Sequence, residues 1–228
     1  RKLKYLTNQM LQNKKRVFWE ALILTLLIFI LGFLSGLVFE NKRVEVIEEY
    51  YIQSENSLMD IFALNNFANL NNLSCGTLIN SNINFANRIY DEAKILDEYE
   101  KAGRITDKID AEHKKYDIMR TFLWINTMKT KEICKDDFTH TIVYIYNFNT
   151  DDLTEKATNN VWSKILSDLK ETRGNEIILI PIAVDSNIIA LNSILENYDL
   201  QQYPVLIIDN KQIINELSSV KDLEKLLD

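Results

Sequence analysis

Residues 141–184 decide the fold expected for this chain, and they read TIVYIYNFNTDDLTEKATNNVWSKILSDLKETRGNEIILIPIAV. The β-branched and aromatic run at 141–146 predicts a buried strand. Apolar residues at helical spacing follow over 152–173, and the pattern ends at Gly174. A second apolar run at 176–184 predicts another strand. This strand–helix–strand order is typical of two parallel strands joined by a crossover helix.

The same alternation continues to the C-terminal residues. Apolar spacing predicts a helix over 187–198, and strands are expected over 204–209 and 212–214. Ser219 is a suitable cap for a last helix. The predicted order is βαβαββα, an α/β fold in which β-α-β crossovers favour parallel pairing and helices cover the sheet. We assign this domain to residues 139–228.

That order, with Pro204 opening the third strand, resembles the thioredoxin-like superfamily over about residues 141–228. The resemblance implies a cis peptide bond between Tyr203 and Pro204 that faces the family's active site. Pro181 fits as well, because a proline inside a strand is tolerated at a sheet edge, where the second strand of the minimal fold lies.

The chain departs from the family where its two redox cysteines would stand. By alignment these positions are Thr150 and Leu153, and neither can form the thiolate that disulfide exchange requires. Asp151 and Asp152 between them are suited to the first turn of a helix, where the helix dipole favours negative charge. The resemblance therefore implies a redox-inactive domain that binds a protein or peptide. The implied partner-binding face consists of Phe148, Thr150, Asp151, Tyr203 and Pro204.

A membrane anchor is predicted at the other end of the sequence. Residues 17–39 read VFWEALILTLLIFILGFLSGLVF, which is long enough to cross ~30 Å of hydrocarbon and contains one charge, Glu20. A cleaved signal peptide has a shorter apolar region that ends in a small-x-small site, so an uncleaved single-pass helix in the lipid bilayer is favoured.

The charges on either side of this segment predict its direction. Residues 1–16 hold six basic residues and no acidic one, which favours a cytoplasmic tail. The residues after 39 carry 20 basic and 32 acidic side chains and would lie outside the cytoplasm, at the cell membrane. The formal net charge of −7 argues against nucleic acid as a partner.

Two patterns near the anchor leave self-association open. Gly32 and Gly36 form a G-x-x-x-G motif, which lets membrane helices approach closely and dimerise, although such a pair can also face lipid. Residues 40–72 are predicted to continue as a helix with apolar residues on heptad positions. This helix could form a coiled coil in a homodimer, or fold against its own chain, which we favour because polar residues interrupt the heptads.

Residues 40–135 are expected to form a helical stalk and hairpin. Apolar spacing predicts two arms separated by Gly103, and Cys75 and Cys134 stand 28 residues before and 31 after that glycine. Antiparallel arms would bring both sulfur atoms to the open end of the hairpin. An extracytoplasmic location favours oxidation, so a structural disulfide is predicted. Two separate buried thiols and a redox-active pair are the alternatives.

Other chemistry has little support in the sequence. There is no P-loop, dinucleotide fingerprint or zincin motif, and no cofactor or metal is expected. His113 and His140 are interpreted as solvated, with a metal pair of His140 and a nearby aspartate as the weaker reading. Asn72 begins an N-x-S sequon and is a candidate for glycosylation.

These features together predict a non-catalytic, membrane-anchored extracytoplasmic protein. Its function would be to bind an envelope or membrane protein as an accessory subunit, through a cysteine-less thioredoxin-like domain. Two alternatives remain: a membrane-tethered thiol-disulfide oxidoreductase that uses Cys75 and Cys134, and an oligomeric structural stalk of the cell envelope.

Overall fold

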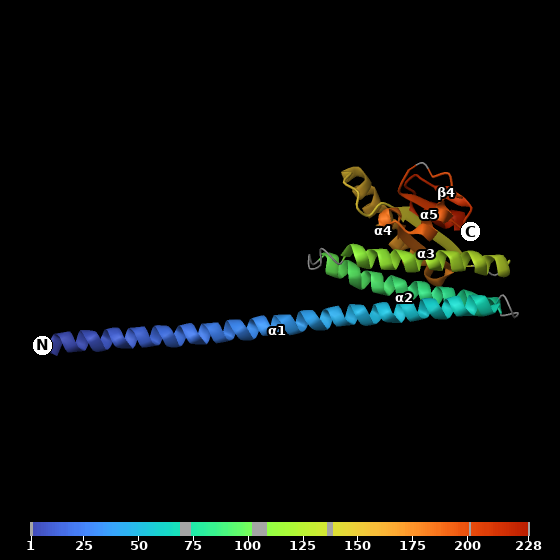
Figure 1. Ribbon diagram of the computed structural model, residues 1–228. Coiled ribbons are helices and arrows are strands. Elements are labelled where there is room, and N and C mark those ends of the chain that lie inside the picture. The colour runs from blue at the N-terminus through green and yellow to red at the C-terminus, as the bar shows by residue number, and fades with distance from the viewer. Residues whose placement is uncertain (1, 69–73, 102–108, 136–138, 201, 228) are drawn as a thin grey trace. The chain divides into compact units, whose positions relative to one another are not determined.

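The structure is a computed structural model that describes residues 2–68, 74–101, 109–135, 139–200 and 202–227 (Figure 1). Its contacts divide the chain into two compact units, residues 1–49 and residues 50–228. The mixed α/β architecture that the sequence predicts is present, and all of the sheet lies in the second unit.

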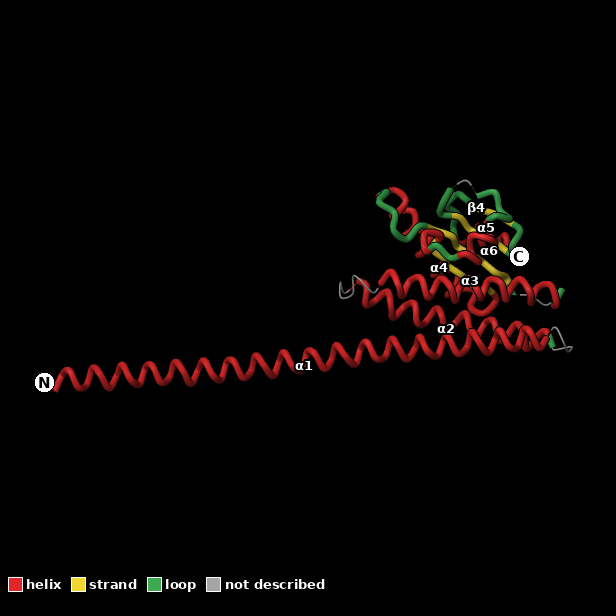
Figure 2. The backbone as a smooth tube through the Cα atoms, in the orientation of Figure 1, coloured by secondary structure: helices red, strands yellow, loops and turns green. Residues whose placement is uncertain are grey.

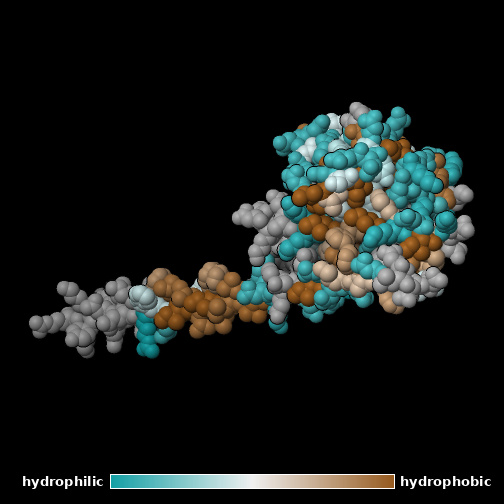
Figure 3. All heavy atoms as spheres, turned by 45° about the vertical axis from the view of Figure 1, so that its right-hand side comes forward, coloured by the Kyte–Doolittle hydropathy of each residue, from teal (hydrophilic) through white to brown (hydrophobic). Residues whose placement is uncertain are grey.

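The first unit is the N-terminal part of helix α1 (Lys2–Ala68). Within it, Arg16–Lys42 is long and apolar enough to cross a membrane, and its surface is hydrophobic in Figure 3. Several polar side chains in this stretch bond within the helix. The hydroxyl groups of Thr25 and Ser35 donate to carbonyls one turn earlier, and Glu20 pairs with Arg16 at 3.0 Å. Internal satisfaction of this kind is what a hydrocarbon environment requires.

Helices α2 (Cys75–Lys101) and α3 (Ile109–Ile133) form the predicted hairpin, and the C-terminal part of α1 packs against it (Figure 1). Leu58 and Ile61 of α1 are buried in a core shared with α2 and α3. Arg88 of α2 donates to the carbonyl of Gln53 at 3.0 Å and also to the hydroxyl of Ser57. This part of α1 therefore folds against its own chain, which is the alternative that we favour over a coiled coil.

Cys75 and Cys134 form a disulfide bond, with Cα atoms 5.6 Å apart. Cys75 is the first residue of α2, and Cys134 directly follows α3, so the bond closes the open end of the hairpin as predicted. No cysteine is left free.

The sheet contains β1 (His140–Tyr146), β2 (Ile177–Ala183), β3 (Val205–Ile208) and β4 (Gln212–Ile214) in the order β2-β1-β3-β4 (yellow in Figure 2). Strand β2 is parallel to β1, whereas β3 is antiparallel to both β1 and β4. Pro181 lies in the edge strand β2, as expected.

The prediction of parallel pairing is wrong for the second crossover, and helix length explains why. Helix α4 (Leu153–Arg173) has 21 residues and rises ~31 Å, enough to return the chain to the opposite end of the sheet. Helix α5 (Ile189–Leu195) has only seven residues, ~10 Å, and is shorter than the predicted 187–198. The chain therefore enters β3 from the end at which it left β2, and β3 runs antiparallel.

Both faces of the sheet are covered, and each face has its own core. On one face, Val143 and Ile145 of β1 join the core formed by α1, α2, α3 and α5. On the other, Ile142 and Tyr144 pack with residues of α4 and of α6 (Val220–Leu227). The helical hairpin and the sheet thus share one hydrophobic core. This core extends across the predicted boundary between residues 40–135 and residues 139–228.

Candidate functional site

The candidate site begins at the loop that follows β1, which two carboxylates hold in place. Glu155 accepts hydrogen bonds from the side chains of Asn147 and Thr150, at 2.6 and 2.5 Å. Asp185, which follows β2, accepts from the backbone N–H groups of residues 148 and 149 at 3.0 and 2.7 Å. The loop at the carboxyl end of β1 is therefore tied both to α4 and to the end of the neighbouring strand.

Asp152 caps helix α4 and accepts hydrogen bonds from the N–H groups of Thr154 and Glu155. It stands just before the helix, and Glu155 is the acidic residue of the first turn. The sequence predicts that Asp151 and Asp152 both act as carboxylates at the start of this helix, and this is confirmed for Asp152. Asp151 is exposed to solvent.

Tyr203 and Pro204 lie beside this loop and are joined by a cis peptide bond. They line a polar pocket of about 460 Å³ together with Asn147, Asp152 and Glu155. Of the predicted partner-binding residues, Tyr203 and Pro204 line this pocket, whereas Thr150 is half-buried and donates to Glu155.

Exposed apolar side chains stand at the same end of the sheet. Leu153 begins α4 after the carboxyl end of β1, and it is 80% exposed. Ile189 begins α5 after the carboxyl end of β2, and it is 85% exposed. Strands β1 and β2 are parallel, so Leu153 and Ile189 follow strand ends at the same edge of the sheet. Pro204 lies at that edge as well, because the next residue, Val205, pairs with Ile145 near the end of β1. We call Leu153, Ile189, Tyr203, Pro204 and the loop 147–152 the proline face.

The proline face lies far from the disulfide. Lys131, three residues before Cys134, pairs with Asp209 at 3.1 Å, and Asp209 accepts from the N–H group of Thr141 at the start of β1. Seven residues of β1 separate that end from the proline face, a distance of roughly 20 Å. The sulfur atoms and the cis proline are therefore at opposite ends of the strand.

A larger groove adjoins the proline face, with a volume of about 790 Å³. It is lined by residues of α2, α3, α4, β1 and β2, and we call it the α2–α4 groove. Phe148 lines it, and its ring lies 3.9 Å from the ring of His113. His113 is thus half-buried against an aromatic ring, which corrects its interpretation as solvated.

The electrostatics of the groove depend on two buried groups. Asp117 of α3 is 1% exposed; it pairs with Arg120 at 3.4 Å and accepts from the hydroxyl group of Ser186 and the N–H group of Ala183. Burial raises the pKa of Asp117, while Arg120 and these hydrogen bonds oppose the rise. Burial also raises the pKa of Tyr144 well above its usual range, so its hydroxyl stays neutral and donates to Asn159 at 3.0 Å.

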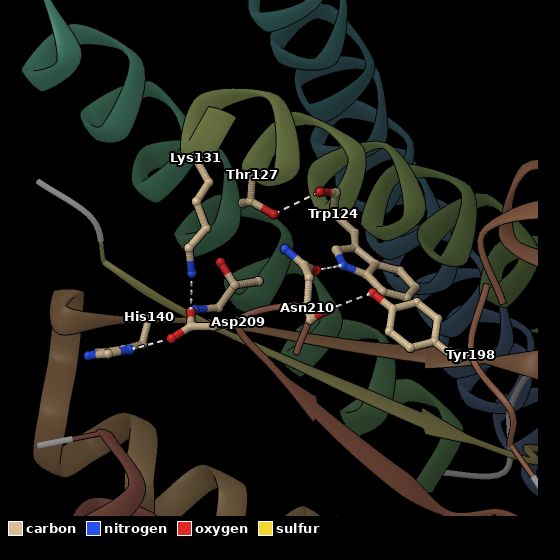
Figure 4. Close-up of polar contacts among 8 residues, drawn as sticks. Trp124, Thr127, Lys131, His140, Tyr198, Asp209 and Asn210 are labelled. Atoms are coloured by element: carbon tan, nitrogen blue, oxygen red, sulfur yellow. Dashed lines mark hydrogen bonds and ion pairs between the residues drawn. The ribbon is translucent and has the colours of Figure 1, made fainter. Parts of the chain in front are cut away.

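A polar cluster at the far end of β1 attaches α3 to the β3–β4 turn (Figure 4). The indole N–H of Trp124 donates to Asn210 at 2.5 Å, and Asp209 pairs with Lys131 and with His140, the latter at 2.7 Å. Burial favours a higher pKa for Asp209, but the N–H group of Thr141 together with His140 and Lys131 lowers its pKa overall. His140 therefore hydrogen-bonds to Asp209 while its side chain stays partly exposed.

The remaining predicted sites are not assembled into a reactive centre. Among the described residues, no group of three or more His, Cys, Asp or Glu side chains is placed to hold a metal ion. Gly32 and Gly36 lie on α1, and a Cβ atom at either would meet nothing within 4 Å. Asn72 and the aspartates 136 and 137 lie outside the described residues.

The sequence reasoning missed the α2–α4 groove. One signal was available: Lys156, Asn159, Asn160 and Ser163 form a polar stripe at helical spacing on α4. Nothing in the sequence indicated that this stripe faces the hairpin helices.

Comparison with protein-family models, with curated proteins and with solved structures finds no match to this chain.

Proposed function

We propose that this chain is a membrane-tethered, non-catalytic binding protein whose C-terminal part is a thioredoxin-like domain without redox thiols. The observation that carries this proposal is the proline face, where Leu153 and Ile189 are exposed at the same end of the sheet as Pro204, while the Cys75–Cys134 disulfide lies toward the other end of β1. Thr150 and Leu153 stand at the positions that the resemblance assigns to cysteine, and the hydroxyl of Thr150 is engaged by Glu155.

The order and direction of the strands support the thioredoxin-like part of the proposal. A parallel β1–β2 pair, Pro181 in the edge strand β2 and Pro204 directly before β3 agree with the pattern on which the resemblance rests. The loop around Asp185 and Glu155 is held by side-chain hydrogen bonds, which preorganise the face and lower the ordering cost of binding.

The anchor determines where the domain would work. Arg16–Lys42 would cross the membrane, and the basic residues of the N-terminal flank would hold that end in the cytoplasm. The acidic remainder would then face the outside, where the Cys75–Cys134 bond is stable. The partner would be an envelope or membrane protein that presents an extended apolar segment.

Site-specific photo-crosslinking of the full chain in its membrane tests the proposal. A photoreactive residue at Leu153 should capture a discrete protein, whereas one at Ile133, which is also exposed and apolar but lies beside the disulfide, should not. Identical products from both positions would contradict a binding role for the proline face. Insulin reduction that is lost in Cys134→Ser would instead support the oxidoreductase alternative.

A further inference from the structure

The α2–α4 groove has a charge opposite to that of the chain around it. Three basic side chains line it, Lys94, Arg120 and Lys156, and its described lining residues include no Asp or Glu. Arg120 is paired with Asp117, which lies buried behind it, so Lys94 and Lys156 supply the net positive charge. The residues after 39 carry 32 acidic side chains against 20 basic ones. A concave basic surface attracts anions, whereas the acidic surface around it repels them.

One of these basic groups is buried and incompletely satisfied. Arg120 is 9% exposed, and its Nη1 atom pairs with Asp117 at 3.4 Å. Its Nε atom is buried and has no hydrogen-bond partner in the described part of the chain. Because this Nε atom has no exposed surface and Asp117 engages Nη1, Arg120 forms part of the groove wall, and the exposed Lys94 and Lys156 are the basic groups that a ligand can reach.

Aromatic rings and amides make up much of the remaining wall. Tyr144 and Tyr146 stack with their centroids 5.1 Å apart, and the ammonium group of Lys94 lies 4.5 Å above the ring of Tyr90. Asn159, Asn160 and Ser163 add donors and acceptors. Such a lining fits a ligand that has flat C–H faces and many hydroxyl groups, which are the features of a sugar ring.

An acidic peptide suits the groove less well. Aside from the aromatic rings, Ala93 and Pro181 are the apolar side chains of the described lining, so the groove offers no deep pocket for aliphatic anchors. A peptide could also bind by adding a strand to the free edge of β2, but few backbone groups are available there. Pro181 has no N–H group, Lys170 occupies the carbonyl of Ile177, and Asp117 occupies the N–H group of Ala183.

We propose that the α2–α4 groove binds an acidic saccharide, with the exposed Lys94 and Lys156 meeting its carboxylates and the half-buried rings of Tyr90 and Tyr146 packing on its sugar faces. This site adjoins the pocket at Tyr203 and Pro204, with which it shares Asn147, but Lys94 and Lys156 do not line that pocket, and binding at the groove does not require a protein partner at the proline face. It would let a membrane-tethered protein hold to a carboxylated glycan outside the cell.

Calorimetric titration of the full chain in detergent tests this site. The probes are tetragalacturonate and a hyaluronan tetrasaccharide, compared with neutral chitotetraose and a tetraglutamate peptide. We expect an acidic saccharide to bind with a Kd below about 1 mM, and its affinity to fall as salt is raised. Lys156→Gln should weaken it about threefold, and combination with Lys94→Gln about tenfold.

The matched control is Lys164→Gln, an exposed lysine on the same helix that does not line the groove. The control should leave the affinity unchanged. No binding of either acidic saccharide, or equal losses in the Lys156 and Lys164 variants, would overturn the proposal. Tighter binding of tetraglutamate than of both saccharides would overturn it as well, because the groove would then be a peptide site. None of these outcomes bears on crosslinking from Leu153.

Discussion

Replacing Asp117 by alanine should destabilise the second unit strongly, because this carboxylate is the polar link between α3 and the end of β2. It is 1% exposed and holds Arg120 at 3.4 Å, the hydroxyl group of Ser186 at 2.5 Å and the N–H group of Ala183 at 3.2 Å. Asp117→Ala leaves the guanidinium and the N–H group without this acceptor. Removing one partner of a buried ion pair costs about 3–5 kcal/mol.

Asp117→Asn separates the hydrogen bonds from the charge. The amide oxygen can still accept from the N–H group of Ala183, while the amide NH2 group takes the place of the second oxygen and can donate to the hydroxyl oxygen of Ser186. The neutral side chain also avoids the desolvation that raises the pKa of the carboxyl group. We expect this variant to lose only about 1–2 kcal/mol. For a unit of this size, the alanine variant should lower the melting temperature by about 10 °C and the asparagine variant by about 4 °C.

The assay is thermal unfolding of the full chain in detergent, followed by tryptophan fluorescence, since Trp124 and Trp162 are buried. Asp168→Ala, an exposed acid on α4, is the control and should melt like the unchanged protein. Equal melting of the alanine variant and the control would refute the reasoning. So would an asparagine variant that is as unstable as the alanine variant, because the charge would then outweigh the hydrogen bonds.

Three further predictions concern the disulfide, the acid range and the proline face. Replacing Cys75 and Cys134 by alanine opens a loop with a sequence separation of 59, which the chain-entropy account values at about 4 kcal/mol; a melting temperature unchanged by the double variant or by reductant would contradict this. The pKa of Asp209 is lowered in the folded state, so its stabilisation is complete above the unfolded value of 3.8 and is lost as pH falls through the lower folded value. Asp209→Asn should therefore flatten the acid side of the stability–pH curve, and an unaltered acid limb in urea titrations would show that the ion pairs contribute nothing. The double variant Thr150→Cys and Leu153→Cys should acquire dithiol-dependent insulin reduction if the domain is thioredoxin-like, whereas inert thiols would count against that fold assignment.

The order of helices and strands was predictable because each element shows its own periodicity. The strand at 141–146 and the helix after it appear nearly as predicted, since burial of an apolar face imposes a repeat of two or of 3.6 residues. Antiparallel arms of similar length on either side of Gly103 were sufficient to pair Cys75 with Cys134. The direction of β3 was not predictable from the same pattern, since it depends on the length of α5, and helix ends are the least certain part of a pattern.

The α2–α4 groove shows why a candidate site can escape sequence reasoning. Tyr90, Arg120, Tyr146 and Lys156 come from four elements, and no short motif joins them. The roles of His113 and His140 were missed for the same reason. Their partners, Phe148 and Asp209, are distant in the chain and meet them only in the folded protein.

The amino-acid sequence alone determined the apolar span, the α/β alternation and the cysteine pairing, because these depend on composition and on spacing along the chain. Only the tertiary structure decided that the hairpin shares a core with the sheet, that Asp117 and Asp209 attach α3 at its two ends, and that basic and aromatic side chains line one groove. These features depend on contacts between segments far apart in the chain, and local periodicity does not encode which faces will meet.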